Sequence, residues 1–134
     1  MRIWLHQTLA NYAPLVTLVG DRIYQGESMT STPKTKPFLV HRLGNASPEI
    51  WTGDPTEDIR PNQRYFSLYV HDNKGDYTRI DEILDLLRRW LPMEAPVASE
   101  HILEVRYLET SRDLDDAAFD TIQRYIRFLA ILSR

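Results

Sequence analysis

The clearest pattern in the chain runs from Gln63 to Leu91, where a two-residue period gives way to a helical period of about 3.6. Phe66, Leu68 and Val70 alternate with other residue types, which predicts a strand with one aliphatic face. Residues 72–75 predict a turn. Apolar residues then recur on one helical stripe: Ile80, Ile83, Leu84, Leu87, Trp90 and Leu91. We therefore expect a helix, capped by Asp76 and ended by Pro92, that folds back onto the aliphatic face of the strand.

The first twenty residues also have helical spacing, with these side chains near one face: Leu5, Leu9, Tyr12, Val16 and Val19. Pro14 lies inside this segment, and proline lacks the N–H that a helix interior needs. We expect a first helix to about Asn11 and a short second one with Pro14 near its first position. Gly20 can adopt the left-handed conformation that commonly ends a helix.

Four further segments are expected to be extended: Arg22–Tyr24, Pro37–Leu43, His101–Tyr107 and Thr121–Leu132. In the third, Leu103, Val105 and Tyr107 share one predicted face. The last segment ends in a continuous apolar run, which predicts burial on both faces. The acidic turn 111–120 joins these last two strands into a predicted hairpin, and residues 26–36 form a polar loop.

Residues 44–62 contain three prolines and two glycines and follow no regular period, so they predict a long loop. A loop of this length in a small domain is usually functional or disordered. It carries Ile50 and Trp51, which either fold back onto the domain or contact another chain. Arg60 is available to pair with an acidic neighbour. We expect these three residues to serve assembly.

Composition indicates an ordinary globular protein, because 43% of the 134 residues are hydrophobic and 26% are charged. We expect a single domain over residues 1–134. No apolar run approaches the ~20 residues that a membrane-spanning helix needs, and no secretory signal pattern is visible. The net charge of −3 argues against tight DNA binding. Cysteine is absent, which excludes disulfides and thiol catalysis.

The densest group of carboxylates is Asp113, Asp115, Asp116 and Asp120. A calcium loop would need a central glycine and a terminal bidentate glutamate, and this segment has neither. These residues are therefore expected to be a solvated turn or a charged surface that faces a partner or a pore. We expect no metal site.

Candidate catalytic groups are sparse. His71 precedes Asp72 and can be interpreted as a base beside its orienting acid, but a histidine at the end of a strand is more ordinarily a surface residue. No nucleophile elbow or phosphate-binding glycine loop is present. Tyr65 and Tyr69 alternate on the face opposite the aliphatic one. They can form a stacking platform for single-stranded nucleic acid or be covered by a neighbouring subunit, and the net acidity favours the subunit. We expect no catalytic residue and no cofactor.

The order of these elements carries a resemblance to a known family. Its most specific piece is Leu18-Val19-Gly20-Asp21-Arg22-Ile23-Tyr24 after a helical start. The proline-led strand, the Gln63-led strand, the helix opened by Asp76-Tyr77 and a final Arg-Tyr-x-x-Arg-Phe strand follow. In these features the chain resembles the tail-completion or tail-terminator proteins of long-tailed bacteriophages, the group that includes minor tail protein U. The likeness covers nearly the whole chain, although residues 44–62 match no pattern.

The resemblance implies an α+β fold, with an antiparallel or mixed sheet of about four to five strands packed on one face by the N-terminal and central helices. It implies a homohexameric ring that caps the tail tube, stops its growth and gives the head a surface to join. The implied partners are the chain itself, the major tail tube protein and the head–tail connector or neck proteins, with DNA only passing through the lumen. The protein would be made in the bacterial cytoplasm, reside at the tail–neck junction of the virion and bind no membrane.

On this interpretation Ile50, Trp51, Arg60, Tyr65 and Tyr69 are interface residues. Asp113, Asp115 and Asp116 form a pore-facing acidic surface that repels phosphates. The alternative within virions is a connector or stopper component of the neck. More distant alternatives are a small enzyme that uses a carboxylate or His71, and a nucleic-acid-binding module.

Overall fold

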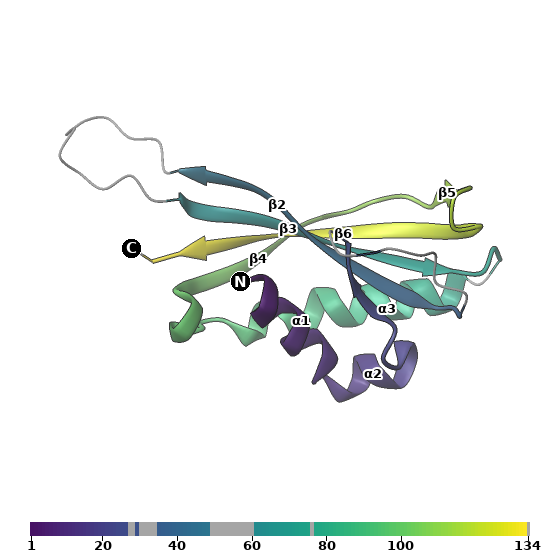
Figure 1. Cartoon of the computed structure of the whole chain (residues 1–134), viewed down its shortest axis with the longest axis horizontal. Coiled ribbons are helices and arrows are strands. Elements are labelled where there is room, and N and C mark those ends of the chain that lie inside the picture. The colour runs from purple at the N-terminus through teal and green to yellow at the C-terminus, as the bar shows by residue number, and fades with distance from the viewer. Residues whose placement is uncertain (27–28, 30–34, 49–60, 76, 134) are drawn as a thin grey trace.

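The computed structural model of the chain describes residues 1–26, 29, 35–48, 61–75 and 77–133. These residues form two layers, a mixed β-sheet and a set of helices that covers one face of it (Figure 1). The helices are α1 (Arg2–Ala10), α2 (Ala13–Val19) and α3 (Tyr77–Trp90). The strands are β1 (Ile23–Gln25), β2 (Phe38–Pro48), β3 (Pro61–Asp72), β4 (Ile102–Thr110), β5 (Leu114–Asp116) and β6 (Thr121–Leu132). The predicted α+β class, with helices on one face, is confirmed.

The six-stranded sheet has the order β1-β2-β3-β6-β4, and β5 also pairs with β6. β1 runs parallel to β2, whereas every other pairing is antiparallel. The sixth strand was not expected, since the acidic segment 111–120 was predicted to be only a turn. Leu114, Asp115 and Asp116 instead pair with Gln123, Ile122 and Thr121, so the hairpin keeps forming ladder pairs beyond the end of β4.

The predicted β3–α3 unit forms the centre of the core. Phe66, Leu68 and Val70 have no exposed surface. The predicted stripe of α3 packs in the same cluster through Ile80, Ile83, Leu84 and Leu87. α3 ends at Trp90 and continues as a 3-10 turn over Leu91–Glu94, because proline at position 92 cannot continue an α-helix. Asp76, the expected cap, lies outside the described residues.

The N-terminal segment divides into two helices, as Pro14 predicted. Pro14 lies in the first turn of α2, and Gly20 follows that helix with a φ of +63°. The buried side chains are Leu5, Leu9, Leu15 and Val19, whereas Val16 is half-buried. Val16 was expected in the core because a continuous helical period was assumed. The break at Asn11 and Tyr12 resets that period and turns Leu15 inward.

Strand β4 departs from the predicted alternation. Ile102 and Val105 are buried, whereas Leu103 is 56% exposed. The pairing steps from Ile102↔Leu132 to Glu104↔Ile131, so two residues of β4 oppose one residue of β6. This bulge shifts the side chains that follow to the other face, which explains why Leu103 and Val105 do not share a face. The predicted burial at the end of β6 is confirmed for Phe128, Leu129 and Ala130.

The β2–β3 hairpin is longer than the sequence predicted. Residues 44–48 were expected in the loop, but Ala46, Ser47 and Pro48 pair with β3 after an irregularity that follows Leu43. The two strands therefore extend past α1, α2 and α3 at one end of the sheet (Figure 1). Residues 49–60, including Ile50, Trp51 and Arg60, lie outside the described residues. Their expected role in assembly stays a prediction.

Candidate assembly surfaces

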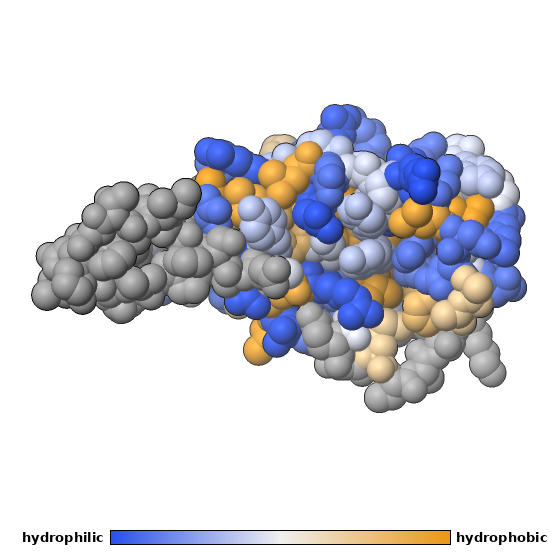
Figure 2. Space-filling model, turned by 90° about the horizontal axis from the view of Figure 1, so that it is seen from above, coloured by the Kyte–Doolittle hydropathy of each residue, from blue (hydrophilic) through white to orange (hydrophobic). Residues whose placement is uncertain are grey.

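The sheet face turned away from the helices, here called the open face, is one candidate site. Strand register places Arg42, Ser67 and Arg127 side by side across β2, β3 and β6 on this face. Tyr69 and Tyr125 form the neighbouring row. Figure 2 looks onto the open face and shows polar and apolar residues interspersed over the described part of it. The face is therefore mixed in character, as protein–protein interfaces generally are.

A hollow of about 460 Å³ lies on the open face, lined by Arg42, Leu43, Gly44, Tyr65, Ser67, Tyr69 and Arg127. The ring centroids of Tyr69 and Tyr125 are 5.8 Å apart. The guanidinium of Arg127 lies 5.4 Å from the Tyr125 centroid, and its Nη1 lies 3.0 Å from Glu109 Oε1. Tyr65 and Tyr69, which the alternation placed on one face, thus line one hollow. Sequence reasoning missed the two arginines beside them, because only the strand register brings them together.

His71 lies at one end of the open face and is only 2% exposed, so its expectation as a surface residue is wrong. Its ring stacks on Phe38 at 4.6 Å, and Phe119 packs against its edge at 5.2 Å. Nδ1 lies 2.9 Å from Thr121 Oγ1. The turn after β5 brings Phe119 over the histidine, and the sequence carried no signal for this cover. Burial lowers the pKa of His71 to about 4, with Asp116 opposing the shift and Arg42 adding to it.

His71 and Asp72 do not act as a base and its orienting acid. Successive residues of a strand point to opposite faces, so Asp72 lies on the helix side of the sheet. Its carboxylate is fully buried and accepts two hydrogen bonds from Arg79 of α3, at 2.6 and 2.5 Å. Asp72 also accepts the N–H of Asn73. The ion pair between Asp72 and Arg79 therefore anchors the start of α3 to the end of β3, which is a structural role.

Of the three carboxylates expected to face a pore, two lie near a cation and the third lies near the neutral imidazole of His71. Asp113 lies 3.6 Å from Arg124 Nε, and Asp115 lies 3.1 Å from Lys74 Nζ. Asp116 lies 3.8 Å from His71 Nδ1 and accepts the N–H groups of residues 118 and 119, so it caps the turn that covers the histidine. Their orientation toward a lumen stays a prediction. In the described part of the chain no three His, Asp or Glu side chains are grouped to hold a metal ion.

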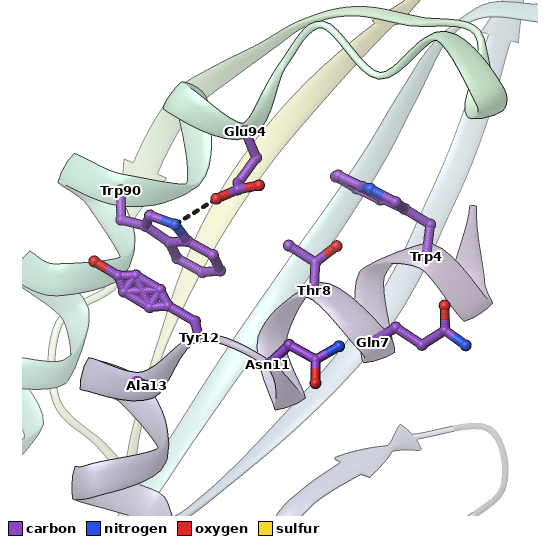
Figure 3. Close-up of a pocket in the computed structure, with 8 residues that line it drawn as sticks. All are labelled: Trp4, Gln7, Thr8, Asn11, Tyr12, Ala13, Trp90 and Glu94. Carbon is purple, nitrogen blue, oxygen red and sulfur yellow. Dashed lines mark hydrogen bonds between the residues drawn. The ribbon is translucent and has the colours of Figure 1, made fainter.

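A second hollow, here called the aromatic pocket, lies in the helix layer and measures about 500 Å³. Trp90 at the end of α3 and Tyr12 before α2 have ring centroids 3.7 Å apart. Trp90 Nε1 donates a hydrogen bond of 2.7 Å to Glu94 Oε1 (Figure 3). The lining residues are Trp4, Gln7, Thr8, Asn11, Tyr12, Ala13, Trp90 and Glu94 (Figure 3). Sequence reasoning missed this pocket, although Trp90 and Glu94 are spaced by about one helical turn.

Comparison with known proteins gives results at the level of structure. No protein-family model matches the chain, and no curated protein matches it. Its structure is similar to that of a chain from the virion of the native gene transfer agent particle, with a TM-score of 0.67 and 15% sequence identity. That match covers 98% of this chain and 93% of the other. The likeness shows the fold.

A second solved structure, of a protein without a descriptive name, has the same fold with a TM-score of 0.60 and 16% identity. It covers 99% of this chain and 93% of that protein. Both matches extend over the helices and the sheet together, so the arrangement of the two layers is shared as a whole.

None of the helices in the described residues has the length and apolar character needed to cross a membrane.

Proposed function

We propose that this chain is a structural subunit of a phage-like virion, in which copies of it form a homohexameric ring that caps the tail tube and joins the tail to the head. The observation that carries the proposal is the likeness of the whole fold to a chain of a gene transfer agent virion, at 98% coverage of this chain. The tail-terminator pattern in the sequence, from Leu18 to Tyr24 and onward, supports the same class independently.

The surfaces of the subunit suit a ring. A closed ring of identical subunits is held by heterologous contacts, in which one patch of a subunit meets a different patch of the next. The open face with Tyr65 and Tyr69 and the aromatic pocket lie on opposite layers of the molecule, so they offer two different patches. Tyrosine and arginine line the hollow on the open face, and tryptophan and tyrosine line the aromatic pocket. These three residue types are the ones most often found at interface hot spots.

The partners proposed for the ring are the tail tube below it and the neck proteins above it. DNA passes through the lumen without specific contact, and the exposed carboxylates of Asp113 and Asp115 are proposed to face it. Negative charges on the lumen wall would repel the phosphates of DNA and discourage it from adhering during passage. No catalytic step is proposed for the subunit.

The experiment pairs native mass spectrometry with electron microscopy of the purified protein. We expect a six-subunit ring with a central hole, and binding of that ring to one end of isolated tail tubes. A ring that binds portal or neck complexes but ignores tubes would identify a connector or stopper. A protein that stays monomeric at all concentrations and binds neither would contradict the proposal.

A matched pair of variants tests whether the open face takes part. Tyr69→Ala removes a ring from the hollow on the open face, whereas Tyr77→Ala removes an exposed tyrosine from the start of α3. Truncation of an aromatic residue at an interface hot spot costs more than about 1 kcal/mol of binding, so Tyr69→Ala is expected to weaken the ring by roughly fivefold or more. Tyr77→Ala is expected to assemble as the wild type does. Thermal melting of both variants checks that the fold is retained.

A further inference from the structure

The aromatic pocket has the chemistry of a site for a cationic side chain. Its walls carry the rings of Trp4, Tyr12 and Trp90, and among the described residues its one carboxylate is Glu94 (Figure 3). Glu94 is exposed, and the one hydrogen bond that it makes among the described residues is accepted from the N–H of Trp90. Tryptophan faces attract guanidinium groups, and a carboxylate can accept two parallel N–H groups from one of them. The volume of about 500 Å³ lies within the roughly 300–1,000 Å³ of ordinary ligand sites.

Apolar side chains flank this pocket in sequence and are left open to solvent. Ile3, which precedes Trp4, is 73% exposed, and Met93, which precedes Glu94, is 79% exposed. Exposed large apolar side chains that adjoin the lining residues in sequence suit a surface that a partner covers. The occupant that fits is therefore a basic side chain carried by a protein surface.

The chain itself carries arginines that suit this site. Arg42 and Arg112 are exposed, and neither has an ion pair within the described residues. Arg42 lies on the open face of the sheet, whereas the pocket lies in the helix layer on the other side. Arg42 therefore cannot fill the pocket of its own chain. A heterologous contact between copies joins two different patches, and Arg42 and the pocket lie on two such patches.

We propose that the aromatic pocket binds an arginine side chain of a second copy of this chain, with the guanidinium held between the tryptophan rings and Glu94. The inference rests on the proposed ring and adds a specific contact to it. Arg42 and Arg112 are the candidate donors. Glu94 supplies the charge, Trp4 and Trp90 supply the stacking surface, and Ile3 and Met93 are covered when the contact forms.

The first test examines the pocket without assembly. The chain has three tryptophans, and two of them line the pocket, so Trp51→Phe leaves only these reporters of fluorescence. We expect arginine amide to change the fluorescence of this protein in a saturable way. Citrulline amide, which has a similar shape but no charge, should act at least about tenfold more weakly. Glu94→Gln should abolish the preference for arginine. Equal responses to both amides would overturn the proposal.

The second test examines the contact between copies. Glu94→Arg places a cation opposite the incoming arginine and should raise the concentration needed for ring formation by about tenfold or more. Glu82→Arg, at an exposed acid of α3, is the matched control and should leave the concentration needed for ring formation unchanged. Combination of Glu94→Arg with Arg42→Glu or Arg112→Glu should restore assembly in one of the two pairs. Rings that form equally well in Glu94→Arg would overturn this contact and leave the proposed function intact. A wild type without rings would overturn both.

Discussion

The burial of His71 makes a prediction about how stability depends on pH. The pKa of His71 is lowered from 6.5 to about 4, chiefly because its ring is enclosed by Phe38 and Phe119. In the unfolded chain the imidazole regains its ordinary pKa. Between the two values the unfolded chain binds a proton that the folded chain does not. Stability from the neutral histidine is therefore complete above about pH 6.5 and is lost as the pH falls toward 4.

The magnitude follows from the two pKa values. The difference is about 2.5 pH units, and each unit corresponds to about 1.36 kcal/mol, so His71 should remove about 3 kcal/mol of unfolding free energy between pH 7 and pH 4. This is a substantial fraction of the ~5–15 kcal/mol typical of a domain. Protonation would also place a charge in a site closed off from water, which favours opening of the turn at Phe119.

The assay is urea denaturation followed by circular dichroism at a series of pH values. His71→Gln keeps a neutral side chain that can hydrogen-bond to Thr121 but does not titrate in this range. We expect the variant to be less stable than the wild type at pH 7 and to lose about 3 kcal/mol less on going to pH 4. His101→Gln, at an exposed histidine, is the control and should keep the full pH dependence. If His71→Gln also keeps the full pH dependence of stability, His71 is not buried in its neutral form.

Three further predictions concern the core, the buried ion pair and the acidic segment. Leu87→Ala should cost about 2–5 kcal/mol of unfolding free energy because Leu87 is fully buried, whereas Arg88→Ala on the exposed side should cost under ~0.5 kcal/mol. Equal effects in urea denaturation would mean that the buried face of α3 is assigned wrongly. Asp72→Asn should cost about 2 kcal/mol of unfolding free energy. This is less than the ~3–5 kcal/mol for breaking a fully buried ion pair, because the Arg79 side chain is 34% exposed. An unchanged thermal melting curve would contradict this prediction. Calorimetry with calcium, magnesium and manganese should find no site tighter than about millimolar; a micromolar site that Asp115→Asn removes would refute this expectation.

The parts of the fold that the sequence predicted are those with a long, regular period. α3 and β3 follow from side chains spaced at 3.6 and two residues, and the same side chains, such as Leu68 and Leu87, are fully buried. The errors lie where a local irregularity breaks the period. The bulge after Ile102 turns Leu103 outward, and the break before α2 turns Leu15 inward in place of Val16. No composition rule locates such irregularities to the residue.

The candidate surfaces were less predictable because they depend on contacts between distant segments. Alternation placed Tyr65 and Tyr69 on one face, but only the register of β2 and β6 adds Arg42 and Arg127 to the same hollow. The aromatic pocket likewise combines α1 with the end of α3. His71 was expected at the surface because the cover over it comes from the turn after β5. In each case the missing information was which strands and helices are neighbours in space.

The most direct test of the central proposal is the growth of tail tubes in the presence of this protein. Tube subunits polymerising in vitro give tubes of varied length, and electron microscopy records both the lengths and the ends. The account predicts that added wild-type protein halts elongation and appears as a ring at one end of each tube, whereas Tyr69→Ala acts only at higher concentration. Tubes that grow to the same lengths with bare ends at saturating protein would contradict the assignment as a tube-capping subunit.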